Sequence, residues 1–219
     1  MAEIDHVVIG ARTLAEGAAF IAAHLGVSPQ PGGKHAGIGT HNMVLGLGPS
    51  CYLEVIAPDP DQPTPPHPRP FDLDDPGMHM MLEAGPRLIA WVARTAALDV
   101  VVARLGSSQA GTVKAWSRGA LSWRMAMPPQ NQDMRNLIPA LIQWDAGPDG
   151  KSGGVAPGLA DSGCRLLGLE AEHPDAASVR SQLAQRGLED ALTVRSSPHA
   201  RLLARFRLAD GQEAVLASA

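Results

Sequence analysis

The order of apolar and polar positions along this chain repeats three times, each time as a strand, a helix and three further strands. In the first copy, an apolar strand over residues 4–11 precedes residues 14–25, where apolar side chains recur at helical spacing up to Gly26. Short strands punctuated by glycine and asparagine are expected near 34–38, 40–47 and 51–57. The pattern predicts a βαβββ unit over residues 4–57.

The second and third copies follow the same order. The second, over residues 87–145, has a predicted helix at about 98–105 and strands near 87–93, 112–118, 121–127 and 137–145. The third, over residues 164–219, has a helix that Asp175 is expected to cap, and strands near 164–169, 192–197, 200–208 and 212–218. We therefore predict an α+β fold of repeated βαβββ modules, with two paired modules within residues 1–145 and a third at 164–219.

Two segments have the composition of loops. The Pro-rich stretch 58–76 and the Gly-, Pro- and Ser-rich stretch 146–163 cannot form helix or sheet interiors. We interpret residues 146–163 as a linker between the second and third modules. Residues 58–76 form a long connection for a compact domain, so they are either a flexible linker or an ordered flap over a pocket.

Charge and composition narrow the choice of partners. The net charge is −4, which provides no basic surface for nucleic acid. Only Cys51 and Cys164 are present, outside any metal-binding spacing, which is typical of a reducing compartment. No apolar run is long enough to span a membrane, and no basic leader starts the chain. We expect a cytoplasmic protein that binds small molecules, not nucleic acid or membranes.

Two ionisable side chains interrupt apolar strands. His6 lies within Ile4–Ile9 and Glu54 within Tyr52–Ile56. Burying such a group without a partner costs roughly several kcal/mol, so each is best explained by the other or by a shared ligand. A polar pocket or structural pair is one interpretation of His6, and metal ligation is the other.

These motifs resemble the vicinal oxygen chelate superfamily, in its glyoxalase-like branch, which includes glyoxalase I, extradiol dioxygenases and bleomycin-resistance proteins. The resemblance covers residues 4–145 and extends to 164–219. It implies that two βαβββ units form a cup that holds a metal through the first and last strands of each unit. The first-strand motif then contains His6 and the last-strand motif contains Glu54. The second unit departs from this pattern, because Leu88 and Gln143 occupy the corresponding positions.

A third ligand depends on the turn before Glu54. A two-residue turn at Pro49-Ser50 would place His41 on the same face as Glu54, whereas a three-residue turn would place Asn42 there. His6, His41 and Glu54 would resemble the two-histidine, one-carboxylate sites that hold Zn, Ni, Mn or Fe with open positions. The alternative is a site that needs no metal.

The tryptophans indicate an apolar wall in the second unit. All four lie there, and a tight turn at Gly119-Ala120 would oppose Trp116 and Trp123 across a hairpin. They serve either as core packing or as the lining of a pocket. With His41, Asn42 and Gln143, we count Trp116 and Trp123 as candidate substrate-binding residues. Cations that could meet an anionic group are Arg124, Arg135, His67 and Arg69.

Three functions fit these residues. The first is a metal-dependent lyase, isomerase or dioxygenase that acts on vicinal oxygens, with Glu54 or a bound water as the base. The second is a metal-free protein of bleomycin-resistance type that binds or sequesters a small molecule. The third is an assembly subunit, because an uncovered third unit would favour a homodimer.

Overall fold

The computed structural model describes residues 2–129, 134, 136–146 and 153–218. The first unit consists of β1 (Glu3–Gly10), α1 (Leu14–Leu25), β2 (Gln30–His35), β3 (Thr40–Gly46) and β4 (Tyr52–Pro58). The second consists of β5 (Arg87–Arg94), α3 (Leu98–Leu105), α4 (Ser107–Ala110), β6 (Val113–Arg118), β7 (Leu121–Ala126) and β8 (Ala140–Trp144). The third consists of β9 (Arg165–His173), α5 (Ala176–Ala184), β10 (Leu192–Ser196), β11 (Arg201–Arg207) and β12 (Glu213–Ala217). The predicted α+β class and the βαβββ order are confirmed.

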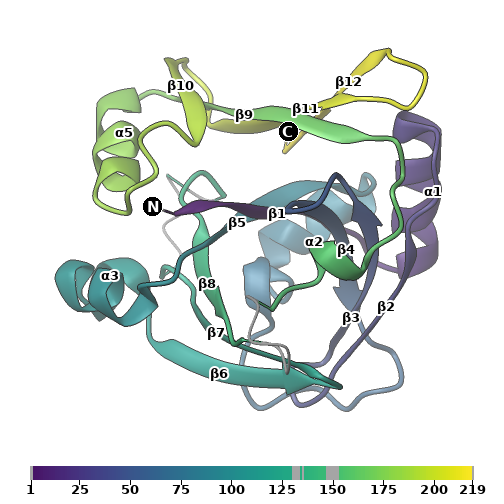
Figure 1. Ribbon diagram of the computed structural model, residues 1–219, viewed down its shortest axis with the longest axis horizontal. Helices are drawn as coiled ribbons and strands as arrows, with labels where there is room; N and C mark the ends of the chain where they lie inside the picture. Colours follow the sequence, from purple (N-terminus) through teal and green to yellow (C-terminus); the bar gives the residue numbers. More distant parts are fainter. Residues whose placement is uncertain (1, 130–133, 135, 147–152, 219) are drawn as a thin grey trace.

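The first two units join into one curled sheet of eight strands, in the order β2-β3-β4-β1-β5-β8-β7-β6 (Figure 1). Within each unit the first strand runs parallel to the last, as β1 does to β4 and β5 to β8. The antiparallel pair of β1 and β5 connects the two units at the centre of the sheet. Because the sheet curls, its terminal strands β2 and β6 approach each other and the inner face becomes a cup.

Local signals account for the helix ends. The Thr13 hydroxyl accepts a hydrogen bond from the Glu16 N–H at 3.2 Å and caps α1, and Gly26 ends this helix with φ +72°. A Cβ at Gly17 would lie 2.3 Å from the Val55 side chain, so α1 packs closely on β4. The second-unit helix also has the expected bounds and ends at Gly106. None of the described helices is long and apolar enough to cross a bilayer.

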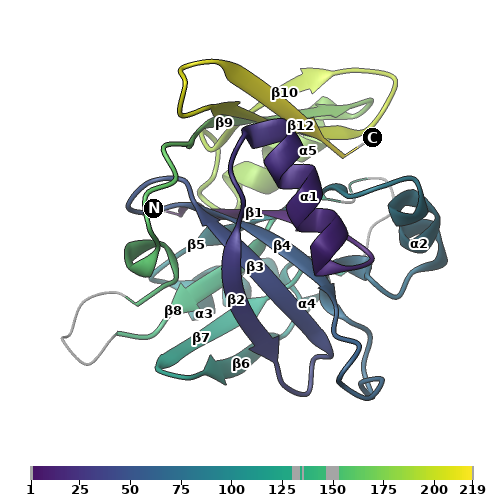
Figure 2. The ribbon, with the colours of Figure 1, turned by 90° about the vertical axis from the view of Figure 1, so that its right-hand side faces the viewer.

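The third unit forms a separate sheet with a different pairing. Its order is β10-β9-β11-β12, so the first strand β9 pairs with β10 and β11 and not with the last strand. This sheet lies over the outer face of the large sheet near β1 and β5 (Figures 1 and 2). Phe206 and Leu216 belong to the same buried apolar cluster as Ile9 and Trp91. The third unit therefore packs its apolar face against the rest of the same chain. A homodimer remains a prediction, but an uncovered third unit no longer argues for it.

The Pro-rich stretch is a flap against the cup. Arg69 Nε donates a hydrogen bond to the Gly39 carbonyl at 2.8 Å, and the Asp59 N–H donates to the same carbonyl at 3.0 Å. The flap leads into α2 (Pro76–Glu83), whose buried Met78 and Leu82 belong to the apolar cluster inside the cup. Of the two interpretations of this segment, the structure supports the flap. The helix α2 was not predicted from the sequence.

Candidate functional site

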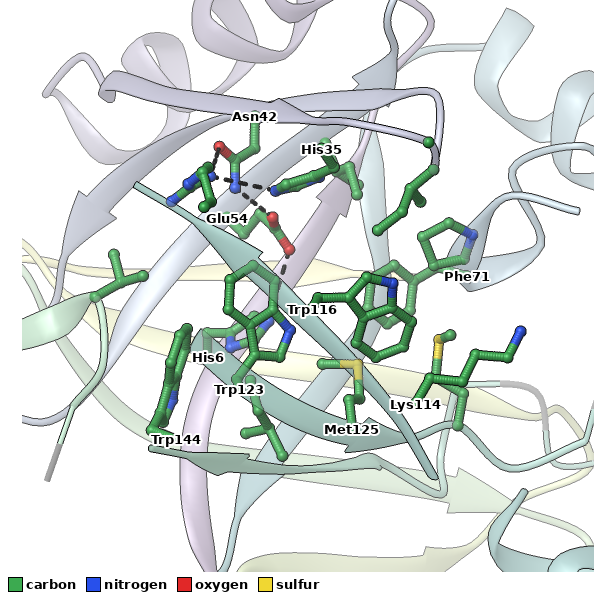
Figure 3. Close-up of a pocket in the computed structure, with 18 of the residues that line it drawn as sticks. His6, His35, Asn42, Glu54, Phe71, Lys114, Trp116, Trp123, Met125 and Trp144 are labelled. Atoms are coloured by element: carbon green, nitrogen blue, oxygen red, sulfur yellow. Dashed lines mark hydrogen bonds and ion pairs between the residues drawn. The ribbon is translucent and has the colours of Figure 1, made fainter. Parts of the chain in front are cut away.

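A cavity of about 210 Å³ occupies the inside of the cup (Figure 3). Strands of both units line it, and the flap contributes its own residues. One wall is apolar and aromatic, and the opposite end is polar. In Figure 3, Glu54, Asn42 and His35 lie together at the polar end, Trp116, Met125 and Phe71 lie away from them, and His6 lies beside Trp123 and Trp144.

A bulge in β1 creates the polar end. Ile4 and His6 pair with consecutive residues of β5, so Asp5 is left over between them. Both Asp5 and His6 are buried, and Asp5 Oδ1 lies 2.7 Å from His6 Nδ1. The other carboxylate oxygen of Asp5 accepts a hydrogen bond from Trp144 Nε1 at 2.9 Å. The bulge thus allows two successive residues to contribute to one buried network.

His6 forms a buried ion pair with Glu54. Its Nε2 lies 3.6 Å from Glu54 Oε2, and its ring stacks on Tyr52 with the centroids 4.5 Å apart. Burial lowers the pKa of His6, but the bonds and charges of Asp5 and Glu54 outweigh burial and raise it to about 9. Burial raises the pKa of Glu54, but His6, followed by His35 and Asn42, outweighs it and lowers this pKa to about 2. At neutral pH the pair is an imidazolium and a carboxylate.

Asn42 connects Glu54 to the two terminal strands of the curled sheet, β2 and β6. Its Nδ2 donates to Glu54 Oε1 at 2.5 Å, and its Oδ1 accepts from the Gly33 N–H at 2.8 Å and from Arg118 at 3.1 Å. Arg118 also lies 3.2 Å from His35 Nε2. Burial lowers the pKa of His35, and because a guanidinium can only donate, His35 Nε2 is the acceptor of this contact. The hydrogen-bond network therefore connects β3 and β4 of the first unit with Arg118 on β6 of the second unit.

The register of β3 and β4 decides between His41 and Asn42. Val44 pairs with Glu54, and the Leu47 N–H donates to the Cys51 carbonyl, so residues 48–50 form a three-residue loop. Asn42 consequently shares the face of Glu54, and His41 lies on the other face, with its Nδ1 3.9 Å from Asp59 Oδ1. The structure therefore does not bring His41 to the cavity with His6 and Glu54, because its expected position assumed the two-residue turn.

Gln143 also lies outside the cavity. Its Oε1 accepts a hydrogen bond from the Leu98 N–H at 3.0 Å, at the start of α3 on the outer side of the sheet. Its neighbours Ile142 and Trp144 line the cavity instead, because successive strand residues point to opposite faces. Leu88 is buried in the outer core. Neither position of the second unit that the resemblance pointed to, Leu88 or Gln143, therefore lines the cavity.

The tryptophan hairpin forms as expected. Trp116 and Trp123 are opposed in the β6–β7 register, and the rings of Trp123 and Trp144 lie 5.3 Å apart at 51°. All three line the cavity, whereas Trp91 lies in the outer core and donates to the Leu137 carbonyl.

Several lining residues were missed from the sequence. Lys114, Arg118 and His35 were given no role, although alternation along residues 113–118 places both cations on the face of Trp116. Of the cations that were considered, His67 lines the cavity, Arg69 pairs with Asp74 and Arg124 pairs with Asp99. Arg135 lies outside the described residues.

The donor set at this site is incomplete for a metal ion. His6 Nδ1 is bonded to Asp5, which leaves His6 Nε2 and Glu54, 3.6 Å apart, as two donors where a metal site needs three or more from the protein. The second unit supplies apolar side chains such as Ile142 and Met125 in place of further ligands. Across the part of the chain that the structure describes, no group of three or more His, Cys, Asp or Glu side chains is arranged to hold a metal.

The ion pair predicts a specific pH dependence of stability. The pKa of His6 is raised from 6.5 to about 9, so its stabilisation is complete below pH 6.5 and is lost as the pH rises towards 9. The pKa of Glu54 is lowered from 4.5 to about 2, so its stabilisation is complete above pH 4.5 and is lost as the pH falls towards 2. We expect the stability difference between wild type and His6→Gln, measured by urea unfolding, to shrink between pH 6.5 and 9. A constant difference would contradict the protonated state of His6.

The chain is similar to known proteins in sequence and in structure. A sequence model of the glyoxalase-like domain matches residues 4–208. A hypothetical protein from Staphylococcus aureus is similar in structure, with a TM-score of 0.58, 13% identity and coverage of 98% of this chain and 85% of its own. Methylmalonyl-CoA epimerase from Mycobacterium tuberculosis has a TM-score of 0.42 and 18% identity, covering 67% of this chain and 89% of its own. No curated protein matches the sequence.

Proposed function

The chain belongs to the glyoxalase-like domain family, within the vicinal oxygen chelate superfamily, and we propose that its cup binds a small aromatic molecule without a metal. The single observation that carries this proposal is the wall of three tryptophans facing a buried His6–Glu54 pair. Pockets for small molecules are commonly apolar and aromatic, with a few polar groups that orient the ligand.

The aromatic wall suits a flat ligand. Trp123 and Trp144 are tilted against each other, and Trp116 lies opposite Trp123 on the same face. Aromatic rings prefer offset or edge-to-face contacts with each other, so these side chains can surround a ring from two directions. Phe71 of the flap adds a further aromatic surface. A ligand in this cavity would replace water on mostly apolar side chains.

The polar end supplies orientation. Glu54 accepts a hydrogen bond from Asn42, and His6 is held by Asp5, so both charged groups are positioned before a ligand arrives. Such preorganised groups reduce the entropic cost of binding. Metal-dependent chemistry, the other interpretation of the sequence, would need ligands that the second unit does not provide among the described residues.

The proposal predicts binding of the neutral probe 4-nitrobenzamide. We expect it to quench tryptophan fluorescence, and we expect Trp123→Ala to weaken its binding about tenfold, as measured by calorimetry, because an aromatic contact and its burial are lost. Trp91→Phe is the matched control, because Trp91 lies in the outer core, away from the cavity.

Metal removal separates the two interpretations. After dialysis against a chelator, binding of the probe should be unchanged, and metal analysis of the purified protein should find no stoichiometric metal. Loss of binding on chelation, restored by a divalent ion, would contradict the proposal. Equal binding by wild type and Trp123→Ala would show that the probe binds elsewhere.

A further inference from the structure

The inner face of β6 carries two cations beside the aromatic wall. Lys114, Trp116 and Arg118 alternate along this strand, so their side chains share one face and all three line the cavity. Arg118 ends the strand at the point where the curled sheet brings β6 near β2. It therefore stands between the aromatic wall and the polar end.

Arg118 has no carboxylate partner among the described residues. Its Nη1 contacts only the neutral acceptors Asn42 Oδ1 and His35 Nε2. Its Nε and Nη2 have no hydrogen-bond partner in the described part of the chain, and neither atom is buried away from solvent. An arginine carries five N–H donors in a planar fork that matches a carboxylate, so most of this capacity stays open to a ligand.

The charges around the cavity favour an anion. Glu54 is the only carboxylate among the described lining residues, and Asp5 lies behind His6. The positive charges of His6, Lys114 and Arg118 outnumber the negative charges of Glu54 and Asp5. The walls of the cavity therefore carry net positive charge, although the whole protein has a net charge of −4. A cavity whose walls carry net positive charge attracts anionic ligands.

The glycine pair of β2 makes room for this arrangement. A Cβ at Gly33 would lie 2.7 Å from Arg118 Cδ, and a Cβ at Gly32 would lie 2.1 Å from Asn42 Oδ1. Neither glycine has a left-handed backbone conformation. What matters at these positions is that glycine has no side chain, which leaves space for Arg118 and Asn42. A residue with a side chain at Gly33 would displace the arginine from the position it holds beside Asn42.

We propose that Arg118 is the specificity residue of the cup and binds the carboxylate of an aromatic acid whose ring packs on Trp116 and Trp123. This inference rests on the proposed function and narrows its ligand to anions. The acid's ring occupies the aromatic wall, and its carboxylate oxygens accept hydrogen bonds from Nε and Nη2 of Arg118. Lys114 adds long-range attraction from the more exposed part of the same strand.

The test compares 4-nitrobenzoate with 4-nitrobenzamide, which share a ring and differ in charge. Wild type should bind the carboxylate at least about tenfold more tightly, because charge-assisted hydrogen bonds are stronger than neutral ones. In Arg118→Met this preference should disappear, while the affinity for the amide stays within about twofold, which also shows that the variant is folded. Arg124→Met, which removes a cation paired with Asp99 on the neighbouring strand, should keep the preference.

The possible outcomes separate the role of Arg118 from the proposed binding of aromatic molecules in the cup. If wild type binds both probes equally, or if Arg118→Met keeps the preference, the role of Arg118 is wrong and the aromatic cup stands. If wild type binds neither probe, the proposed function fails and this inference fails with it. If Arg118→Met binds neither probe, the variant Arg118→Lys is measured instead. If Arg118→Lys still prefers 4-nitrobenzoate, the inference is supported, and if it shows no preference, the inference is overturned.

Discussion

Replacing Glu54 by Gln is expected to lower the free energy of unfolding by about 3 kcal/mol at pH 7, because it removes one partner of a buried ion pair and leaves Asp5 alone to compensate the His6 charge. Glu54 is buried, and it faces His6 at 3.6 Å and Asn42 at 2.5 Å. The glutamine preserves the shape of the side chain, so the loss reports the charge and not a cavity. Urea unfolding followed by tryptophan fluorescence measures it.

A surface carboxylate provides the control for this substitution. Glu170 on β9 lies 3.3 Å from Arg195 and is partly exposed, so Glu170→Gln should cost less than about 1 kcal/mol. The loss in Glu54→Gln should become smaller above pH 9, where His6 loses its proton. Equal losses in the two variants would show that Glu54 and His6 are not an ion pair in the folded protein.

Replacing Phe206 by Ala is expected to cost about 3–5 kcal/mol, because it removes a fully buried ring and leaves a cavity. Phe206 lies on β11 of the small sheet, but its apolar cluster includes Ile9 and Trp91 of the large sheet. We therefore expect the loss to appear in one cooperative transition that involves the whole chain. Val215→Ala on β12 is the control, since Val215 is 46% exposed and should change stability by less than about 0.5 kcal/mol.

The form of the unfolding curve tests the packing of the third unit. If the core is shared, circular dichroism and tryptophan fluorescence should report the same midpoint in Phe206→Ala, because all tryptophans lie in the second unit. Two separate transitions, with the fluorescence midpoint unchanged, would show that the third unit folds on its own. That result would contradict a shared core.

The repeated units could be predicted because local signals decide their elements. Gly26 and Gly106 end helices, and Asp175 accepts a hydrogen bond from the Ser178 N–H as the cap of α5. β2 was placed too late, because Pro31 and the glycines after it lack the side chains that mark a strand. Its pairing with β3 supplies the stabilisation that its own sequence lacks.

The candidate site could be predicted only in part. His6 and Glu54 were found because ionisable groups in apolar strands need partners, a requirement that does not depend on the rest of the fold. His41 was chosen in place of Asn42 because a single residue of loop length reverses every side chain of a strand. Arg118 was missed because an arginine at a strand end ordinarily points to solvent, and only the curl of the sheet turns it inward.

By itself, the sequence determined the order of the βαβββ units, the ends of the main helices, and the two charged residues His6 and Glu54 that need each other as partners. These features follow from spacing, capping and the cost of burial, which act on neighbouring residues. Only the tertiary structure decided which side chains join His6 and Glu54 in the cavity, and how the third sheet pairs and packs. The bulge at Asp5, the β3–β4 register and the approach of β6 to β2 all depend on contacts between residues far apart in the chain.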